Sequence, residues 1–228
     1  RAFPAVTGFV RFVEPDGSGG WYIGGAFSHV GGIPRNNLAH ILADGSVGSW
    51  NPNPDGRSVS AIAVSGSTVY VAGGFTKIGG QPRRYLAALD AATGRATAWA
   101  PEPNTWASAL IVKGSRVYVA GDFGYIGGKD RKGLAALDRD TGKVTDWDPG
   151  ADRNIYRLGL QGSTLYVAGQ FSIIGGQKRN RLAAIDISSD TPRVTDWNPN
   201  PDDRIIALAF SDSAVYAGGN FENIGGEK

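Results

Sequence analysis

One short phrase occurs five times in this chain of 228 residues and limits what the chain can fold into. The copies are residues 21–27 (WYIGGAF), 69–75 (VYVAGGF), 117–123 (VYVAGDF), 165–171 (LYVAGQF) and 215–221 (VYAGGNF). Their closing phenylalanines stand at positions 27, 75, 123, 171 and 221, which gives spacings of 48, 48, 48 and 50 residues. A fixed period in this range is typical of solenoids, propellers and other repeat architectures.

Each repeat reads as four β-strands joined by short connections. In the second repeat, four segments rich in apolar and β-branched residues suit strands. They are residues 59–64 (VSAIAV), 68–72 (TVYVA), 85–89 (YLAAL) and 95–99 (RATAW). Turn-forming residues separate them, namely SGS, a glycine-rich loop and DAATG. Four strands that recur at this spacing describe the blade of a propeller.

The pattern therefore predicts an all-β protein with a β-propeller fold. No segment shows the sustained 3.6-residue apolar period of an amphipathic helix. A β-solenoid is the minor alternative, although its repeats are usually shorter and lack these hairpin turns. Recurring alanine pairs in the third strand suit narrow spaces between packed sheets, and they are Ala87 with Ala88, Ala135 with Ala136, and Ala183 with Ala184.

Residues 1–228 are predicted to form a single propeller domain. The phase of the repeats places four full blades and an inner hairpin in the chain, with repeats at approximately 4–50, 51–99, 100–147, 148–197 and 198–228, the last one partial. Five blades without a closing outer hairpin would leave strand edges exposed, which promotes association. We therefore expect the sequence to be a piece of a longer chain, in a propeller of about six to eight blades.

The combined motifs resemble the delta-60-type β-propeller repeats of bacterial exported and surface proteins. The resemblance rests on VYVAGxF, IGG, LAALDxxTG and WxP, and it covers essentially the whole chain. It implies a bacterial propeller that is extracellular, at the cell surface or periplasmic, and it implies little about activity.

Residues 90–99 and 138–147 also look like the tryptophan-docking motif of quinoprotein dehydrogenase propellers. In that motif three residues separate the glycine from the tryptophan, whereas four separate Gly94 from Trp99 and Gly142 from Trp147. One extra residue reverses the face of a strand side chain, so these tryptophans need not dock as they do in that family. The vicinal cysteine pair common in quinoprotein alcohol dehydrogenases is absent too, because the chain has no cysteine.

Composition narrows the classes of function. The formal net charge is +2 at pH 7, so no global charge recruits nucleic acid or an acidic membrane surface. Without cysteine there is no disulfide, thiolate nucleophile or thiolate metal site. No stretch approaches the roughly 18 apolar residues of a membrane-spanning helix. We expect a protein partner, with a glycan as the alternative, no nucleic acid and no membrane span in this segment.

Basic residues follow the Val/Ile-Gly-Gly triplet in four repeats and are candidate partner-binding residues. They are Arg35, Arg83, Arg84, Lys129, Arg131, Lys132, Lys178, Arg179 and Arg181. Propeller loops between the second and third strands emerge on one face, so these charges could form a crown for an anionic partner. The favoured interpretation is that they pair with acids in the loops that join blades, which emerge on the same face and carry Asp55, Glu102, Asp148, Asp152, Asp202 and Asp203.

Breaks in the repeat supply further candidates. Arg157 replaces an inner-strand alanine (Ala61, Ala109 and Ala207 elsewhere) and could hold an anion in the central channel, although an ion pair at the rim is favoured. His40 replaces the third-strand alanine, and His29 lies in the first glycine loop. With two histidines and no cysteine, we expect no metal site.

Two recurring features have alternative interpretations. Trp50, Trp99, Trp147 and Trp197 could be sugar-stacking platforms, but we expect them to pack between neighbouring blades. The segments 51–55 (NPNPD) and 198–203 (NPNPDD) offer oxygens that Ca²⁺ accepts. Their spacing does not match a 12-residue Ca²⁺ loop, and Asn, Pro and Asp are ordinary turn formers. We therefore expect no cofactor, with Ca²⁺ as the alternative.

The leading interpretation is a non-catalytic extracellular or cell-surface propeller that acts as a protein-binding scaffold. It rests on the lack of a catalytic constellation, because the recurring carboxylates of Asp90, Asp138 and Asp186 occupy turn positions. It also rests on loops that vary at their tips, where function is commonly found. A glycan-binding module that uses basic loops and tryptophan is the alternative, and a carbohydrate-active or quinone-dependent enzyme comes third.

Overall fold

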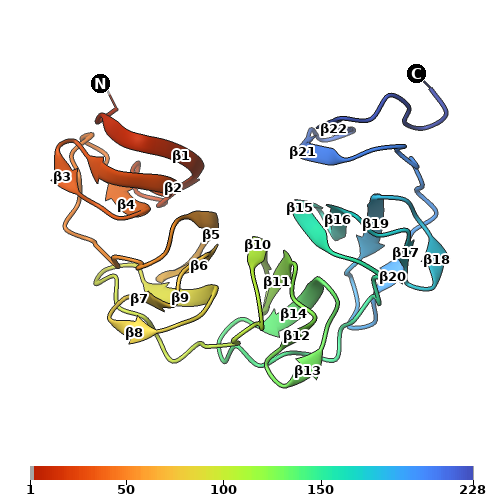
Figure 1. Ribbon diagram of the computed structural model, residues 1–228, viewed down its shortest axis with the longest axis horizontal. Helices are drawn as coiled ribbons and strands as arrows, with labels where there is room; N and C mark the ends of the chain where they lie inside the picture. The colour runs from red at the N-terminus through yellow and green to blue at the C-terminus, as the bar shows by residue number, and fades with distance from the viewer. Residues whose placement is uncertain (1–2, 228) are drawn as a thin grey trace.

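The computed structural model describes residues 3–227, so the predicted limits at Arg1 and Lys228 lie outside the described residues. Antiparallel sheets follow one another along an open arc, as Figure 1 shows. Contacts join the first strands of neighbouring sheets, from β1 through β5, β10 and β15 to β21. This arrangement confirms the all-β propeller and excludes the solenoid, because each sheet radiates from a shared inner edge. Among the described residues, no helix is long and apolar enough to cross a membrane.

Five sheets form the arc. The first holds β1 (Val6–Pro15), β2 (Trp21–Val30), β3 (Ile33–Pro34) and β4 (Leu38–Ile41). The second and third hold β5 (Val59–Ser65), β6 (Thr68–Gly73) and β9 (Leu86–Asp90), and β10 (Ala107–Lys113), β11 (Arg116–Gly121) and β14 (Leu134–Asp138). The fourth holds β15 (Ile155–Gln161), β16 (Thr164–Gly169), β19 (Leu182–Asp186) and β20 (Arg193–Val194), and the fifth holds β21 (Ile205–Phe210) and β22 (Val215–Gly219).

Short hairpins interrupt the predicted glycine loops. Each has two residues per strand and turns at the paired glycines, and the hairpins are β7 (Lys77–Ile78) with β8 (Gln81–Pro82), β12 (Tyr125–Ile126) with β13 (Lys129–Asp130), and β17 (Ile173–Ile174) with β18 (Gln177–Lys178). Gly79 and Gly80 have φ angles of 58° and 80°, a region that glycine adopts at little cost. The GG pairs are therefore hairpin turns.

The predicted fourth strand is present in most of the sheets but is shorter than expected, with the amides of Asp90 and Thr97 donating to the carbonyls of Arg95 and Ala88 in the second sheet. Between Arg95 and Trp99 it shrinks to one bridge between Ala96 and Leu89, and the fourth sheet keeps a two-residue strand, β20. The amide of Thr97 still donates to Ala88 of β9, but the carbonyl of Thr97 accepts a hydrogen bond from the Arg83 side chain. The chain then leaves the sheet, which brings Trp99 against the next sheet.

The tryptophans dock between neighbouring sheets, as predicted. Nε1 of Trp50 donates to the carbonyl of Asp90 at 3.0 Å, and Nε1 of Trp99 donates to that of Asp138 at 3.2 Å. The indole of Trp99 also packs on Gly142, 3.0 Å from where a Cβ would stand. Trp50, Trp99 and Trp147 are buried, whereas Trp197 is 37% exposed. Burial removes the first three as sugar platforms.

The hydrophobic core is divided into layers between successive sheets. One layer joins the second and third sheets through Tyr70, Trp99 and Val119, and another joins the third and fourth through Tyr118 and Trp147. The paired alanines of β9, β14 and β19 are fully buried in these layers, as predicted. Because each layer depends on two sheets, the inner edges of the sheets are held in a fixed relation to one another.

Candidate functional site

Four of the predicted basic residues serve the fold. These four are Arg35, Arg83, Arg131 and Arg179. In each of them, Nη1 donates a hydrogen bond to the carbonyl of the preceding residue. Nη2 donates to a carbonyl in the segment where the fourth strand is predicted, within the same sheet. The second acceptors are Gly48, Thr97, Thr145 and Thr195, and the distance is 2.9 Å for Arg131 to Thr145. Each guanidinium thus donates to a carbonyl at the point where the pairing of the short fourth strand stops.

The other basic loop residues do not converge on one place. Lys129 pairs with Asp146 at 2.6 Å, while Arg84, Lys132 and Lys178 are exposed. These residues lie in or shortly after the strands β8, β13 and β18, which stand around the outer edge of the arc in Figure 1. The exposed basic side chains are therefore distributed over separate sheets and do not form one binding surface.

The acids between blades mostly cap backbone amides. Asp55 accepts from the amides of Thr76 and Lys77 and from the Thr76 hydroxyl. Asn104, Asp152 and Asp202 repeat this arrangement in the following sheets. At Asp152, burial raises the carboxyl pKa, but the hydrogen bonds outweigh it and the pKa is lowered. Pairing with a basic loop is seen at Arg131, whose Nη1 lies 3.4 Å from Asp148.

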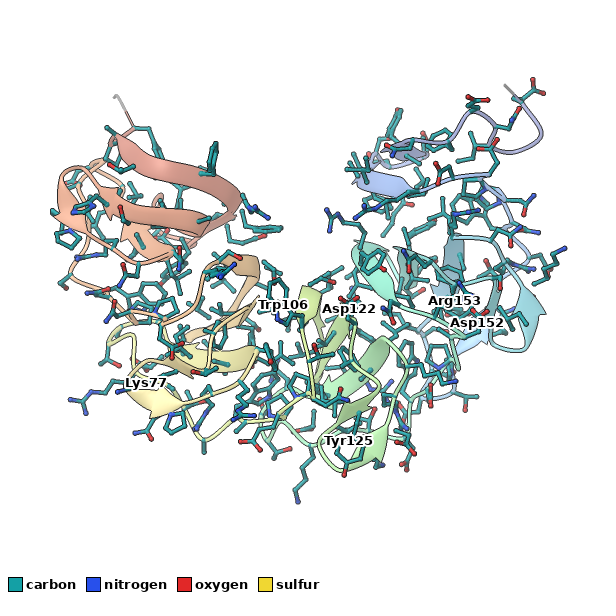
Figure 2. All side chains as sticks on the ribbon, viewed as in Figure 1. Lys77, Trp106, Asp122, Tyr125, Asp152 and Arg153 are labelled. Carbon is teal, nitrogen blue, oxygen red and sulfur yellow. The ribbon has the colours of Figure 1, made fainter. Side chains whose placement is uncertain are left out.

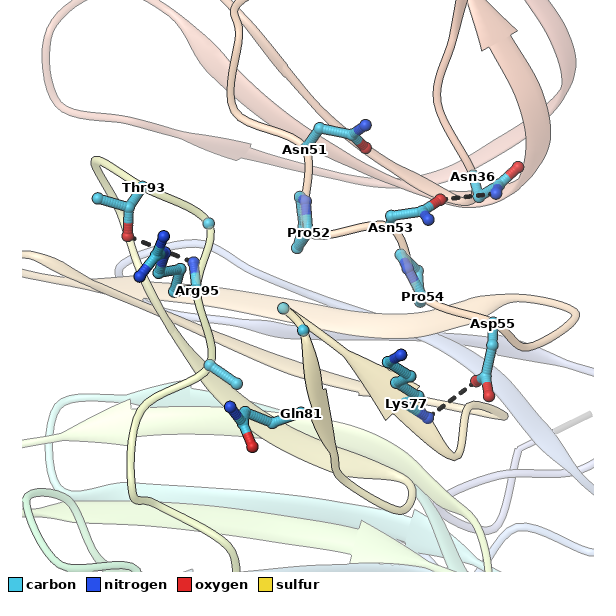
Figure 3. Close-up of a pocket in the computed structure, with 14 residues that line it drawn as sticks. Asn36, Asn51, Pro52, Asn53, Pro54, Asp55, Lys77, Gln81, Thr93 and Arg95 are labelled. Carbon is cyan, nitrogen blue, oxygen red and sulfur yellow. Dashed lines mark hydrogen bonds between the residues drawn. The ribbon is translucent and has the colours of Figure 1, made fainter.

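The loop proposed for Ca²⁺ borders a groove of about 1020 Å³ between the first two sheets, which Figure 3 shows. The Asn53 side-chain oxygen accepts a hydrogen bond from Asn36 at 2.7 Å, and both Asp55 oxygens cap the neighbouring hairpin. The side chains of Asn51, Asn53 and Asp55 are spread along the loop in Figure 3 and do not meet at one point. No group of three or more His, Cys, Asp or Glu within residues 3–227 could hold a metal ion.

The two histidines have separate local partners. Nε2 of His40 lies 2.8 Å from a carboxylate oxygen of Asp16, and its ring stacks on Tyr22 at 4.4 Å. Nδ1 of His29 lies 3.0 Å from the Ser28 hydroxyl. His40 therefore fills the alanine position with a hydrogen-bonding contact to the β1–β2 turn.

A ring of variable pairs lines the inner rim of the arc. Each pair consists of the residue before Phe in the repeated phrase and the residue before the first strand of the next sheet, and two of these pairs are in contact. Trp106 lies over Gly74, at 3.3 Å from a Cβ placed there, and Asn154 donates to Asp122 at 3.1 Å. Arg204 and Gln170 line one small cavity. Figure 2 shows Trp106 and Asp122 at the inner edge, with Lys77 on the outer side.

The inner rim opens into a central cavity of about 930 Å³. Its polar lining comes from the hydroxyls of Ser58, Ser60 and Ser108, the carboxylate of Asp122 and the guanidinium groups of Arg11, Arg157 and Arg204. Trp106 and Tyr156 supply aromatic surface, and Trp106 is 50% exposed. An exposed tryptophan beside cations is the composition typical of residues that anchor protein interfaces.

Arg157 lines this central cavity, which is the position that the hypothesis of an anion held by Arg157 in the central channel requires. Its Nε donates to the carbonyl of Ile206 at 2.8 Å and its Nη1 to that of Tyr156 at 3.0 Å. Burial and the nearby Arg204 lower the pKa of Arg157. No carboxylate of the described chain forms an ion pair with it. The favoured ion pair at the rim is therefore wrong, because the guanidinium joins β15 to β21 through backbone carbonyls.

A smaller cavity of about 300 Å³ adjoins Arg204, at the junction of the fourth and fifth sheets. The rest of its lining comes from Arg153, Gly169, Gln170, Arg181 and Asp203. Arg181 has a left-handed φ of 59° and its Nη1 lies 3.5 Å from the Pro201 carbonyl. Of the ten predicted basic residues, Arg157 and Arg181 each share a cavity with Arg204.

Sequence reasoning missed Trp106, Asn154 and Arg204. They stand 17 residues before Phe123, Phe171 and Phe221, where the second repeat has Ser58. A position occupied by Ser, Trp, Asn and Arg in successive copies breaks the repeat more strongly than the basic loops do. That variation was the available signal, and the periodic spacing of Arg35, Arg83, Arg131 and Arg179 was the signal for a structural role.

Comparisons with known proteins support the propeller. A family model described as outer membrane protein assembly factor BamB, which belongs to the quinoprotein-type propellers, matches residues 30–216. The computationally designed Ika8 protein superposes with a TM-score of 0.54 and 15% identity, over 96% of this chain and 70% of that chain. The designed Ika4 protein gives a TM-score of 0.50 and 16% identity, over 73% of this chain and 89% of that chain. The comparison with curated proteins gives no match.

The cavity residues do not fit an enclosed quinone cofactor. Trp106 and Ile206 are 50% and 46% exposed, and Arg11 and Arg204 are exposed as well. Redox cofactors depend on a site that excludes competing reactions with solvent.

Proposed function

The chain belongs to the family of the outer membrane protein assembly factor BamB, and on that premise we propose that it is a non-catalytic scaffold that binds a protein partner at its central cavity. The observation that carries the proposal is the exposed indole of Trp106, seated on Gly74 at the mouth of a cavity of about 930 Å³. Aromatic side chains of this kind contribute apolar area and are enriched among residues that dominate binding energy.

The family description supports the kind of partner and the location. It names an outer membrane protein assembly factor, which agrees with a bacterial protein that works in the cell envelope on polypeptides. Within the described residues, the carboxylates of Asp55, Asp152 and Asp202 cap backbone amides. These groups are engaged in the fold, which favours binding over acid–base chemistry.

Photo-crosslinking from the cavity tests this proposal. Trp106 is replaced by p-benzoylphenylalanine and the protein is irradiated in the cells that produce it, with products identified by mass spectrometry. We expect a discrete polypeptide adduct. The matched position is Arg84, which is exposed on the outer basic loop of the second sheet. Adducts from the Arg84 position with none from the Trp106 position would place binding on the loops and overturn the proposal.

A further inference from the structure

The junction between the fourth and fifth sheets carries positive charges that no acidic side chain of the described residues pairs with. Three arginines line the cavity of about 300 Å³, namely Arg153, Arg181 and Arg204, and Asp203 is the one acid of that lining. No described acid forms an ion pair with any of the three. The lining therefore keeps an excess of two positive charges (three minus one).

These arginines differ from the periodic ones in what they contact. In Arg131 and its equivalents, both Nη atoms donate hydrogen bonds to backbone carbonyls of the same sheet. Arg153 has no hydrogen bond to the described chain, and Arg204 contacts the Tyr156 ring, with Cζ 5.6 Å from its centroid. The exposed guanidinium groups of Arg153 and Arg204 are free to bind a ligand in the forked geometry that suits carboxylates. Arg181 uses one donor, because its Nη1 lies 3.5 Å from the Pro201 carbonyl.

The neighbouring cavity extends the charge toward the centre. Arg204 lines both cavities, and Arg157 stands in the larger one, where burial and the charge of Arg204 lower its pKa. An anion bound between them would relieve this repulsion. The charge is thus continuous from the sheet junction to the cavity that holds Trp106.

We infer that Arg153, Arg181 and Arg204 form a subsite for carboxylate side chains of an acidic segment in the protein partner. The inference rests on the proposed function and specifies the chemistry of the partner. The segment would place an apolar or aromatic residue on Trp106 and one or more Asp or Glu side chains in the arginine subsite. A cavity of about 300 Å³ suits a side chain, and bidentate arginine–carboxylate pairs add both affinity and register.

Calorimetric titration with a blocked hexaglutamate peptide tests the subsite. We expect the hexaglutamate peptide to bind the wild-type protein and the uncharged hexaglutamine peptide not to bind it. The double variant Arg153→Gln/Arg204→Gln should bind hexaglutamate at least about tenfold more weakly, since each lost charged hydrogen bond is a substantial part of such an affinity. Both side chains are exposed, so the fold should persist. The variant Arg95→Gln, which removes an exposed arginine from the groove between the first two sheets, is the matched control.

Four outcomes would contradict the inference. Hexaglutamate binding could be unchanged in the double variant, or reduced equally by Arg95→Gln, which would indicate nonspecific charge attraction. Inorganic phosphate could compete with the peptide at equal concentration, which would assign the subsite to phosphate groups. Retention of affinity in Arg204→Lys alone would support a point charge over the forked contact and would remove the bidentate geometry from the inference.

The two proposals fail separately. If position 106 crosslinks to a polypeptide whose binding is unaffected by Arg153→Gln/Arg204→Gln, the scaffold stands and the carboxylate subsite is wrong. If position 106 gives no polypeptide adduct, the proposed function is wrong whatever the peptide titration shows.

Discussion

At the scale of single residues, the structure divides the basic side chains into two groups that look alike in the sequence. Arg131 is partly buried and donates to backbone carbonyls, whereas the adjacent Lys132 is exposed. A guanidinium that satisfies buried carbonyls contributes to stability, because removing it leaves those acceptors unpaired. Proximity in sequence therefore does not indicate a shared role.

Arg131 and Lys132 provide a matched test of this division. We expect Arg131→Met to lower the free energy of unfolding by about 1–3 kcal/mol, because it removes the donors to Asp130 and Thr145. Lys132→Met should change it by no more than about 0.5 kcal/mol. Urea denaturation followed by circular dichroism measures both. Equal effects of the two substitutions would mean that Arg131 is a surface charge and has no structural role.

Asp16 makes stability depend on acid pH. Burial raises the pKa of its carboxyl, but hydrogen bonds from His40, Ser18 and Gly20 outweigh burial and hold the pKa well below its usual range. The folded protein therefore binds this proton less readily than the unfolded chain does. The stabilisation is complete above the unfolded pKa of about 4 and is lost as pH falls below it.

Asp16→Asn should flatten the acid side of the stability profile. Chemical denaturation at several pH values between about 2 and 6 would show a smaller loss of stability in the variant than in the wild type. Asp212→Asn, at an exposed position in the turn between β21 and β22, is the control and should leave the slope unchanged. An unaltered slope in Asp16→Asn would contradict the assignment.

At the scale of elements, the DxxTG turn is a docking surface for the tryptophan of the preceding sheet. Gly142 has a φ of 76° and the Trp99 ring lies against it. The Asp138 carbonyl of the same turn accepts the indole hydrogen bond. The extra residue between glycine and tryptophan is thus compatible with docking, because the segment leaves the sheet before it reaches the indole.

Two glycines separate the docking effect from backbone strain. Gly114 also has a left-handed φ, of 58°, but nothing lies within 4 Å of a Cβ placed there. Gly114→Ala should cost about 1 kcal/mol for the left-handed conformation. Gly142→Ala should cost about 1–3 kcal/mol more, since its methyl group overpacks the indole. Thermal unfolding compares them, and equal costs would show that the indole moves aside freely.

At the scale of the whole molecule, burial depends on whether a second sheet covers a side chain. Tyr118 and Tyr216 hold the same place in the repeated phrase, yet Tyr118 is 2% exposed and Tyr216 is 59% exposed. Tyr118 contacts Trp147, with ring centroids 5.1 Å apart, in the layer between the third and fourth sheets. The contribution of a repeated residue is therefore set by its neighbours.

Alanine substitutions at these two tyrosines measure that contribution. Tyr118→Ala should destabilise the protein by about 3–5 kcal/mol, as large aromatic truncations in a core do. Tyr216→Ala should cost less than about 1 kcal/mol, since most of its ring faces solvent. Urea denaturation of the two variants gives the comparison. A similar cost at both sites would show that Tyr216 is covered in the folded protein in solution.

The repeated phrase and the turns were enough to predict the all-β propeller, most strand positions and the burial of the alanine pairs and of three tryptophans. These features depend on contacts that recur in each copy, so the period reveals them. The fourth strands are shorter than predicted because Arg83 and its equivalents donate to the carbonyls at which strand pairing would continue. The length of the complete propeller, the delta-60 relationship and the glycan alternative stay predictions.

The sequence by itself determined the architecture, because strand alternation, glycine turns and a fixed period are local properties of the chain. The tertiary structure alone decided which charges are free and where they gather. Trp106 packs on Gly74, and Arg204 and Gln170 line one cavity, across the junctions between sheets. Residues more than thirty positions apart come together only when neighbouring sheets pack at their inner edges, so the candidate binding surface is a property of the packed arc.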